Sequence, residues 1–266
     1  MKCFEYYINH WQLTADGEPI ITRSSKLLPV MQNAIPAMLK IAEEPEEKSG
    51  ANLMVCWSGH GAAGVLAHHN NALLLERATG KRSLSAMAKN ADDTEASKII
   101  CAVIHTLHSQ TATKLPELVP LDQWLAELDA GAEKYGGILL PCAETARTLL
   151  SSPQEVVVLH GDIHHDNILD FGERGWLAID PKGLTGERGF DYANMFCNPD
   201  HKTAAAPGRL AKQAAVVSKA AGLHHKRLLQ WVLAWAGLSA LWSFNDGVEK
   251  EMDLQIAQIA AAELRK

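Results

Sequence analysis

The sequence predicts a two-lobed α+β protein, in which a small antiparallel-sheet lobe is followed by a larger, mainly helical lobe. Short apolar runs separated by turn residues occupy the first part of the chain, which is typical of an antiparallel sheet. From about residue 81 the apolar residues recur with helical spacing instead. The chain has 266 residues, which is enough for two lobes that each bury a core. We therefore expect an N-lobe over residues 1–77 and a C-lobe over residues 78–266.

In the N-lobe, turn residues separate several short apolar runs. These runs predict strands at residues 19–22, 27–31, 34–41, 65–68 and 72–75, and helix-compatible spacing predicts a helix at 51–57. The glycines of Gly59–Gly64 match a dinucleotide-binding loop, but strand-like residues follow where such a loop needs a helix. We expect a turn that leads into a hairpin there.

In the C-lobe, amphipathic patterns predict helices at residues 92–108, 121–135 and 138–150 and across residues 208–263. The apolar run at residues 156–159 predicts a buried strand, and residues 176–179 predict a second one. Residues 228–244 are apolar over the minimum length of a membrane span, but polar and small residues interrupt them. We expect a buried helix there and no membrane anchor.

The overall composition limits the possible partners and the compartment. With 25 basic and 31 acidic residues the net charge is −6, which argues against nucleic acid and favours a cationic small molecule. The five cysteines form no C-x-x-C pair, which is typical of reduced thiols in a cytoplasmic protein. No apolar segment of signal-peptide type follows the N-terminus. The sequence gives no indication of the oligomeric state.

A loop between the two C-lobe strands carries the strongest chemical signal. His160, Asp162 and Asn167 have the H-x-D-x-x-x-x-N spacing of a phosphotransferase catalytic loop, and Asp180 follows the second strand. Phosphoryl transfer needs one carboxylate to orient and deprotonate the acceptor hydroxyl, and a carboxylate and an amide oxygen to hold Mg²⁺. Asp162 suits the first role, and Asn167 and Asp180 suit the second.

The segment HGDIHHDNIL…WLAIDPKGLTGERGFDYANMFCNP resembles the kinase-like small-molecule phosphotransferases. It is most similar to the branch that contains aminoglycoside (streptomycin) 6-phosphotransferases and hydroxyurea kinases. The clear part of the resemblance covers residues 156–199. It implies a protein-kinase-like fold, ATP and Mg²⁺ as cofactors, and a small-molecule hydroxyl as acceptor. The motif is specific for the superfamily and much less specific for the acceptor.

The resemblance also implies roles for residues of the N-lobe. Lys40 ends an apolar strand, as does the lysine that pairs the ATP phosphates, and Glu47 in the acidic cluster at residues 43–47 is its expected ion-pair partner. No glycine-rich loop precedes Lys40, so Ser24 and Ser25 are the expected phosphate donors. The segment that includes Glu76 and Ala78 resembles the interlobe linker, whose backbone meets the adenine.

Three further carboxylates are candidates for binding a cationic acceptor. By analogy with the family they are Asp191, Asp246 and Glu249, although ordinary acidic turns and helix caps explain them equally well.

Alternatives remain open at the level of function. The acceptor could be streptomycin-like, hydroxyurea-like, or another metabolite such as an amino sugar or amino alcohol, and antibiotic resistance is not distinguished from metabolism. A non-catalytic nucleotide-binding regulator with the same fold is a further alternative. The intact set of Lys40, Asp162, Asn167 and Asp180 argues against it, because a regulator has no chemical need for all four.

Overall fold

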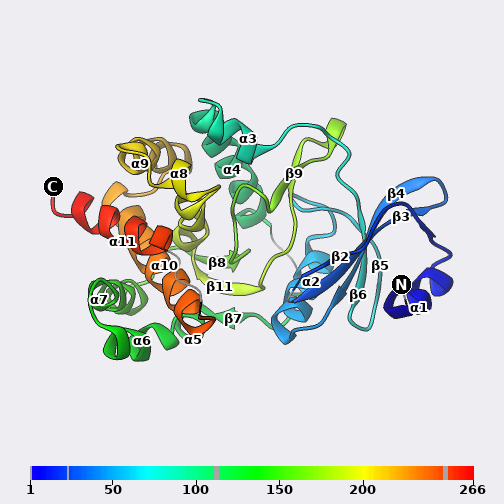
Figure 1. Cartoon of the computed structure of the whole chain (residues 1–266), viewed down its shortest axis with the longest axis horizontal. Coiled ribbons are helices and arrows are strands. Elements are labelled where there is room, and N and C mark those ends of the chain that lie inside the picture. Colours follow the sequence, from blue (N-terminus) through cyan, green and yellow to red (C-terminus); the bar gives the residue numbers. More distant parts are fainter. Residues whose placement is uncertain (1, 23, 111–113, 248–250) are drawn as a thin grey trace.

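The computed structural model describes residues 2–22, 24–110, 114–247 and 251–266. The described residues form the expected two lobes, with an antiparallel sheet at one end of the molecule and helices at the other (Figure 1). The chain leaves the sheet after Glu76 and enters the first C-lobe helix at Leu84. We propose that the lobe boundary lies between residues 77 and 78.

An antiparallel sheet with strands of different lengths forms the centre of the N-lobe. Among the described residues its strands are β1 (Thr14–Ala15), β2 (Ile20–Ile21), β3 (Ser25–Gln32), β4 (Ile35–Ala42), β5 (Val65–His69) and β6 (Ala72–Glu76). Their order is β1-β3-β4-β6-β5, and β2 pairs with β3. The predicted strands are thus present, while β1 was not predicted, because two residues show no alternation.

Helices cover both faces of this sheet. On one face, Ala37, Leu39 and Ile41 of β4 pack with Phe4 and Tyr7 of helix α1 (Lys2–His10). The alternate residues of β4, which include Lys40, face helix α2 (Pro45–Trp57) and the C-lobe. The sequence did not predict α1, because its apolar face is short and is stabilised by packing on the sheet. Strand alternation therefore places Lys40 on the interlobe side.

Helix α2 is longer than the predicted helix at residues 51–57. Pro45 occupies the first turn, where its fixed φ and missing N–H cost nothing, and Glu46 and Glu47 complement the helix dipole. Gly50 lies where α2 meets the C-lobe. A Cβ atom on Gly50 would lie 1.8 Å from the carbonyl oxygen of Pro181. Only glycine therefore allows α2 to approach the loop after Asp180 this closely.

The C-lobe is built around one long buried helix, α10 (His225–Asn245), which packs against its neighbours across the lobe (Figure 1). The other helices are α3 (Leu84–Lys89), α4 (Asp93–His108), α5 (Leu121–Trp124), α6 (Glu127–Tyr135), α7 (Leu139–Ser151), α8 (His201–Ala204), α9 (Arg209–Ala221) and α11 (Glu251–Glu263). The helix predicted at 121–135 is interrupted at residues 125–126, which separates α5 from α6. In the described part of the chain, no helix is long and apolar enough to span a membrane.

Short strands hold the loop that carries the motif. Strand β8 (Val156–Leu159) pairs with β11 (Leu184–Glu187), which also pairs with β7 (Val119–Pro120). Strand β9 (Ile168–Asp170) pairs with β10 (Trp176–Ala178). The two predicted strands therefore exist but belong to different sheets. The loop at residues 160–167 runs from one sheet to the other, and Asp180 follows β10.

Short 3₁₀ turns lie between β9 and β10 and between β11 and the last helices. They are η1 (Gly172–Arg174) between β9 and β10, η2 (Arg188–Tyr192) and η3 (Asn194–Cys197). The turns η2 and η3 place Asp191 and Asn194 beneath the loop at residues 160–167.

Candidate active site

A buried carboxylate fixes the start of the loop that follows β8. Asp191 accepts hydrogen bonds from the backbone N–H groups of His160 at 2.9 Å and Gly161 at 2.8 Å, and its side chain also contacts Nε2 of His108 at 2.8 Å. The φ of Gly161 is 87°, a left-handed conformation that favours glycine. The turn after β8 therefore presents Asp162 in a defined direction.

His160 braces this turn without carrying a charge. Its ring is fully buried, Nε2 donates to the carbonyl oxygen of Ile179 at 2.8 Å, and Nδ1 accepts from the backbone N–H of Asp162 at 3.2 Å. Burial lowers the pKa of His160 to about 4, so the ring is neutral near pH 7. This geometry fits a bracing role and leaves the base role to Asp162.

The Asp162 carboxylate is held by two side-chain amides. Asn167 Nδ2 donates to Oδ2 at 3.2 Å, and Asn194 Nδ2 donates to Oδ1 at 2.8 Å. Burial raises the pKa of Asp162 to about 7, although the ammonium group of Lys182 partly opposes this rise. A carboxylate whose pKa lies close to neutral pH is suited to accept a proton from a hydroxyl.

Asn167 and Asp180 lie on adjacent strand ends. The backbone N–H of Ile179 donates to the carbonyl oxygen of Asn167 at 2.9 Å, and Asp180 is the next residue, with a φ of 63°. Burial alone would raise the pKa of Asp180, but Lys40 and Lys182 outweigh it and lower the pKa to about 2. The ionised carboxylate and the amide oxygen are both oxygen donors of the kind that Mg²⁺ prefers.

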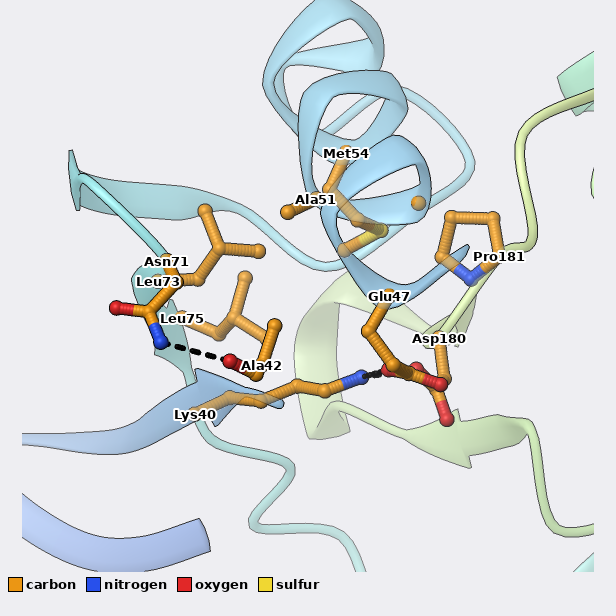
Figure 2. A pocket seen from close by; sticks show the side chains of 11 residues that line it. Lys40, Ala42, Glu47, Ala51, Met54, Asn71, Leu73, Leu75, Asp180 and Pro181 are labelled. Carbon is orange, nitrogen blue, oxygen red and sulfur yellow. Dashed lines mark hydrogen bonds and ion pairs between the residues drawn. The ribbon is translucent and has the colours of Figure 1, made fainter. Parts of the chain in front are cut away.

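An ion-pair network joins the lobes at the same point. Lys40 Nζ contacts Glu47 Oε2 and Asp180 Oδ1, as Figure 2 shows, and Lys182 Nζ lies 2.7 Å from Glu47 Oε1. The Glu47 side chain has no exposed surface. Its two oxygens therefore hold one ammonium group from each lobe. The structure brings Lys40 and Glu47 together as the resemblance implied, and it adds Lys182, which the sequence did not single out.

The expected phosphate donors separate in the structure. Ser25 begins β3 and is buried, and its hydroxyl donates to Glu47 Oε2 at 3.1 Å. The Ser25 hydroxyl is therefore engaged with Glu47 in this structure, and a phosphate contact by Ser25 stays a prediction. Ser24 lines the large cavity described below and remains a candidate. Arg23 of the same turn lies outside the described residues.

The two linker candidates lie at the end of β6 and just after it. The Glu76 carboxylate accepts the backbone N–H of Gly64 at 2.6 Å and pairs with Arg174 Nη1. Ala78 follows in the half-buried segment that leaves β6. The backbone N–H of Glu76 is also engaged, since it donates to the carbonyl oxygen of Gly64 at 2.9 Å, and an adenine contact by this segment remains a prediction.

The three acceptor-binding candidates lie in different environments. The Asp191 side chain has no exposed surface and binds the loop backbone, so it does not fit direct contact with an acceptor. Asp246 is exposed and lines the same cavity as Asp162. Glu249 lies outside the described residues.

A cavity of about 830 Å³ opens on the catalytic loop. Gly161, Asp162 and Lys182 line it, and α10 contributes Trp235 and Trp242. Its carboxylates come from both lobes: Glu44, Glu46, Glu127 and Asp246. Glu127 is oriented by the indole N–H of Trp242, at 2.6 Å from Oε1. The sequence reasoning missed Glu127, Asn194 and Lys182, because no motif spacing marks them; only the acidic run before α2 gave a signal for Glu44 and Glu46.

The sequence matches known proteins over most of its length. A family model described as "Aminoglycoside/hydroxyurea antibiotic resistance kinase" matches residues 10–247. A streptomycin 3''-kinase from Klebsiella pneumoniae is 47% identical over 245 residues, which are 90% of this chain and 92% of that protein. A streptomycin 6-kinase from Streptomyces griseus is 28% identical over 269 residues, covering 94% of this chain and 85% of that protein.

The fold has solved counterparts as well. The crystal structure of a choline kinase from Streptococcus pneumoniae matches with a TM-score of 0.69 at 11% identity, and the match covers 99% of this chain and 98% of that one. At this identity the likeness concerns the fold alone. It is the protein-kinase-like arrangement of an antiparallel-sheet N-lobe and a helical C-lobe, as the sequence predicted.

Proposed function

Because the chain belongs to the aminoglycoside/hydroxyurea antibiotic resistance kinase family, we propose that it phosphorylates streptomycin on the 3'' hydroxyl. The chain is an ATP-dependent phosphotransferase that acts on an alcohol group of a small molecule. The 3'' position is favoured over the 6 position, because the 3''-kinase is 47% identical and the 6-kinase is 28% identical. The substrate and the position are the parts that we propose.

Residues that meet at the interlobe contact are assigned to the nucleotide. Lys40 holds the phosphates, and Glu47 keeps Lys40 and Lys182 in place. Asn167 and Asp180 fit Mg²⁺, because their oxygens come from adjacent strand ends and the Asp180 pKa is low enough for full ionisation. When bound, the metal supplies neutralisation of charge on the phosphate oxygens.

Asp162 is assigned to the acceptor hydroxyl. Its two oxygens are held by amides, and it opens on the 830 Å³ cavity. The carboxylate orients the hydroxyl toward the terminal phosphate and takes its proton as the new O–P bond forms. The bond to the leaving ADP breaks in the same step, so the carboxylate needs only to accept one proton.

The cavity beside Asp162 is the observation that supports streptomycin as the acceptor. Carboxylates from both lobes surround it, and tryptophan rings form its wall. Streptomycin carries guanidinium groups, which carboxylates bind in a bidentate manner and aromatic rings bind through cation–π contacts. A cavity of about 830 Å³ is far larger than hydroxyurea requires. Size and charge thus both favour a large cationic acceptor.

Product analysis tests this proposal. The protein is incubated with Mg-ATP and, separately, streptomycin, hydroxyurea, choline or an amino sugar, and the products are located by ³¹P–¹H NMR. We expect phosphorylated streptomycin with the phosphate on the 3'' oxygen. Phosphate on the 6 oxygen would contradict the position, and turnover of another acceptor alone would contradict the substrate.

A matched variant separates binding from chemistry. Glu127→Gln keeps the shape and can still accept from Trp242 while it removes the charge. If the cavity binds a cation, the KM for streptomycin rises about tenfold or more, as expected for the loss of a charge-assisted hydrogen bond, and kcat changes little. An unchanged KM would exclude Glu127 from the acceptor site.

A further inference from the structure

The amide of Asn194 can take only one orientation. Its Oδ1 accepts from the indole Nε1–H of Trp235 at 2.9 Å and from Asn198 Nδ2 at 3.0 Å. An indole N–H can only donate, so the atom that faces Trp235 must be the amide oxygen. Asn194 is buried, and its Nδ2 therefore faces the other way, toward Asp162.

This orientation determines how Asp162 is held. Asn194 Nδ2 donates to Oδ1 at 2.8 Å, while Asn167 Nδ2 donates to Oδ2 at the longer distance of 3.2 Å. One donor on each oxygen fixes the plane of the carboxylate, and the shorter contact comes from Asn194. Reaction geometry depends on such a fixed plane, because a displacement of about 1 Å in a reacting group can reduce a rate about 10²-fold.

Trp235 connects this amide to the large cavity. It belongs to α10, is buried, and is one of the residues that line the cavity. Edge-to-face contacts with Phe190, at a centroid distance of 5.0 Å, and with Trp242, at 5.9 Å, hold the ring. The donor that orients Asn194 is therefore itself rigid.

We propose that Asn194 is a positioning residue for Asp162 and that Trp235 sets its orientation, so that α10 links the wall of the acceptor cavity to the catalytic carboxylate. The proposal rests on the phosphotransferase activity and on the role of Asp162, and not on which molecule is the acceptor. Asn194 acts through the Asp162 carboxylate, since its amide is bonded to Asp162, Trp235 and Asn198 and Asn194 is not among the residues that line the cavity.

Two substitutions test the link. Asn194→Leu removes the donor to Asp162, and Trp235→Phe keeps an aromatic wall but removes the N–H that orients the amide. We expect kcat to fall about 10²-fold for Asn194→Leu, because the loss of the donor displaces the Asp162 carboxylate. For Trp235→Phe we expect a fall of about tenfold, because the Asn194 amide keeps its donor but is held less firmly. The Kd of Mg-ATP, measured by calorimetry, stays within about twofold, and the acceptor KM changes less than kcat.

The matched comparison is Trp242→Phe. It makes the same change on the same helix and in the same cavity, but the lost N–H serves Glu127 and not Asn194. Here we expect the acceptor KM to rise more than kcat falls. If Trp235→Phe shows the same pattern as Trp242→Phe, both tryptophans are simply cavity wall and the proposal is overturned.

The double variant supplies the decisive readout. If Trp235 acts through Asn194, then Asn194→Leu with Trp235→Phe has the kcat of Asn194→Leu alone; if the two losses multiply, the residues act independently and the link is wrong. Melting temperatures are recorded for each variant. Asn194→Ala gives a second route should Asn194→Leu not fold, because it removes the donor to Asp162 with a smaller side chain and introduces no new charge; a wild-type kcat in that variant would overturn the proposal.

The readout does not depend on streptomycin. If the wild type does not phosphorylate streptomycin, the proposed acceptor fails, and the same comparison of variants is made with the acceptor that does react, or with the slow transfer to water that releases phosphate from ATP. Variants that match the wild type in those assays would overturn the positioning role separately.

Discussion

At the scale of single residues, the Glu47 carboxylate forms ion pairs with lysines of both lobes. It binds Lys40 from the N-lobe and Lys182 from the C-lobe, and Ser25 donates to it as well. A carboxylate without exposed surface requires such partners, because an unpaired buried charge is strongly destabilising. The same contacts bring Lys40 to Asp180.

A substitution at Lys182 tests how much its ion pair with Glu47 contributes to stability. Lys182→Met leaves one oxygen of Glu47 without its partner, so we expect the free energy of unfolding to fall by about 2 kcal/mol, as for a lost hydrogen bond to a charged group. Urea denaturation monitored by tryptophan fluorescence measures the change. Lys182→Arg should restore most of the loss; equal destabilisation by Met and Arg would instead indicate a packing effect.

Single residues were predictable from the sequence where a motif fixed their spacing. Asp162 and Asn167 belong to one loop pattern, and Lys40 follows three apolar residues in a predicted strand, so all three were predicted. Lys182 and Asn194 were not, because their roles come from contacts with residues far away in the chain, at Glu47 and Asp162. Glu47 was chosen by resemblance, and the fold supplied its partners.

At the scale of secondary-structure elements, helix α2 is positioned by close contact with the loop after β10. Gly50 of α2 meets the carbonyl oxygen of Pro181, and that contact is next to both Asp180 and Lys182. Figure 2 shows the first turns of α2 beside Pro181, with Glu47 directed toward Lys40 and Asp180. The position of a whole helix therefore depends on one missing Cβ atom.

Gly50→Ala tests the packing of α2 against this loop. Helix propensity alone predicts a gain of about 1 kcal/mol, because alanine is the better helix former. The new Cβ would lie 1.8 Å from Pro181 O, so we expect a net loss of about 1–3 kcal/mol instead, as for an overpacked core, and weaker Mg-ATP binding. Calorimetric melting and nucleotide titration measure both effects.

Lys48→Ala is the control on the same helix. Lys48 is exposed, so the free energy of unfolding of the Lys48→Ala variant should stay within about 0.5 kcal/mol of the wild-type value. A stable Gly50→Ala variant with normal nucleotide affinity would show that α2 can move away from the loop without consequence.

Elements with a clear apolar run or helical spacing could be predicted from the sequence, and several of the shortest elements could not. The strands β3, β4 and β6 follow from short apolar runs between turn residues, and the helices α4 and α10 follow from helical spacing or a long apolar run. Strand β9, with three residues, has too few positions to show a period. No proline or glycine marks the break between α5 and α6 in the sequence. We attribute the break to packing against the rest of the lobe, which no local pattern shows.

At the scale of the whole molecule, the C-lobe is held together by buried ion pairs that join its strands to its last helices. Glu187 of β11 contacts Arg227 Nε at 2.6 Å and Trp231 Nε1 at 2.8 Å, both from α10, and accepts the backbone N–H of Gln154 at 2.9 Å. It is almost fully buried. This carboxylate ties α10, which carries Trp235, to the sheet that supports the catalytic loop.

The pH dependence of stability tests the contribution of the Glu187 carboxylate and its contacts with α10. Burial alone would raise the pKa of Glu187, but Arg227 and Trp231 lower it below its ordinary value of 4.5. A depressed pKa contributes stability that is complete above the unfolded-state pKa and is lost as pH falls through the folded-state value. Glu187→Gln should therefore cost about 3 kcal/mol at pH 7 and clearly less at pH 4, in urea denaturation at each pH.

The control for this experiment is Glu173→Gln. Glu173 is exposed, so its substitution should change stability by less than about 0.5 kcal/mol at either pH. If the cost of Glu187→Gln were the same at pH 4 and pH 7, the contribution would come from shape and not from charge.

The two-lobed organisation could be predicted from the sequence, since the shift from strand-like to helix-like patterns is visible along the chain. The large cavity beside Asp162 could not. Its carboxylates come from residues 44 and 46, from residue 127 and from residue 246, which no local pattern links. Only the packing of α2, α6 and α10 around the catalytic loop brings them together.

The measurement that tests this account most directly is ADP release by the wild type and by Asp162→Ala, with Mg-ATP and streptomycin, alongside nucleotide titration of both proteins. The account predicts streptomycin-dependent turnover in the wild type and a loss of about 10²–10⁴-fold in the variant, with a nearly unchanged Kd for Mg-ATP. Retained turnover in Asp162→Ala, or loss of nucleotide binding together with activity, would contradict the assignment of Asp162 as the residue that orients and deprotonates the acceptor.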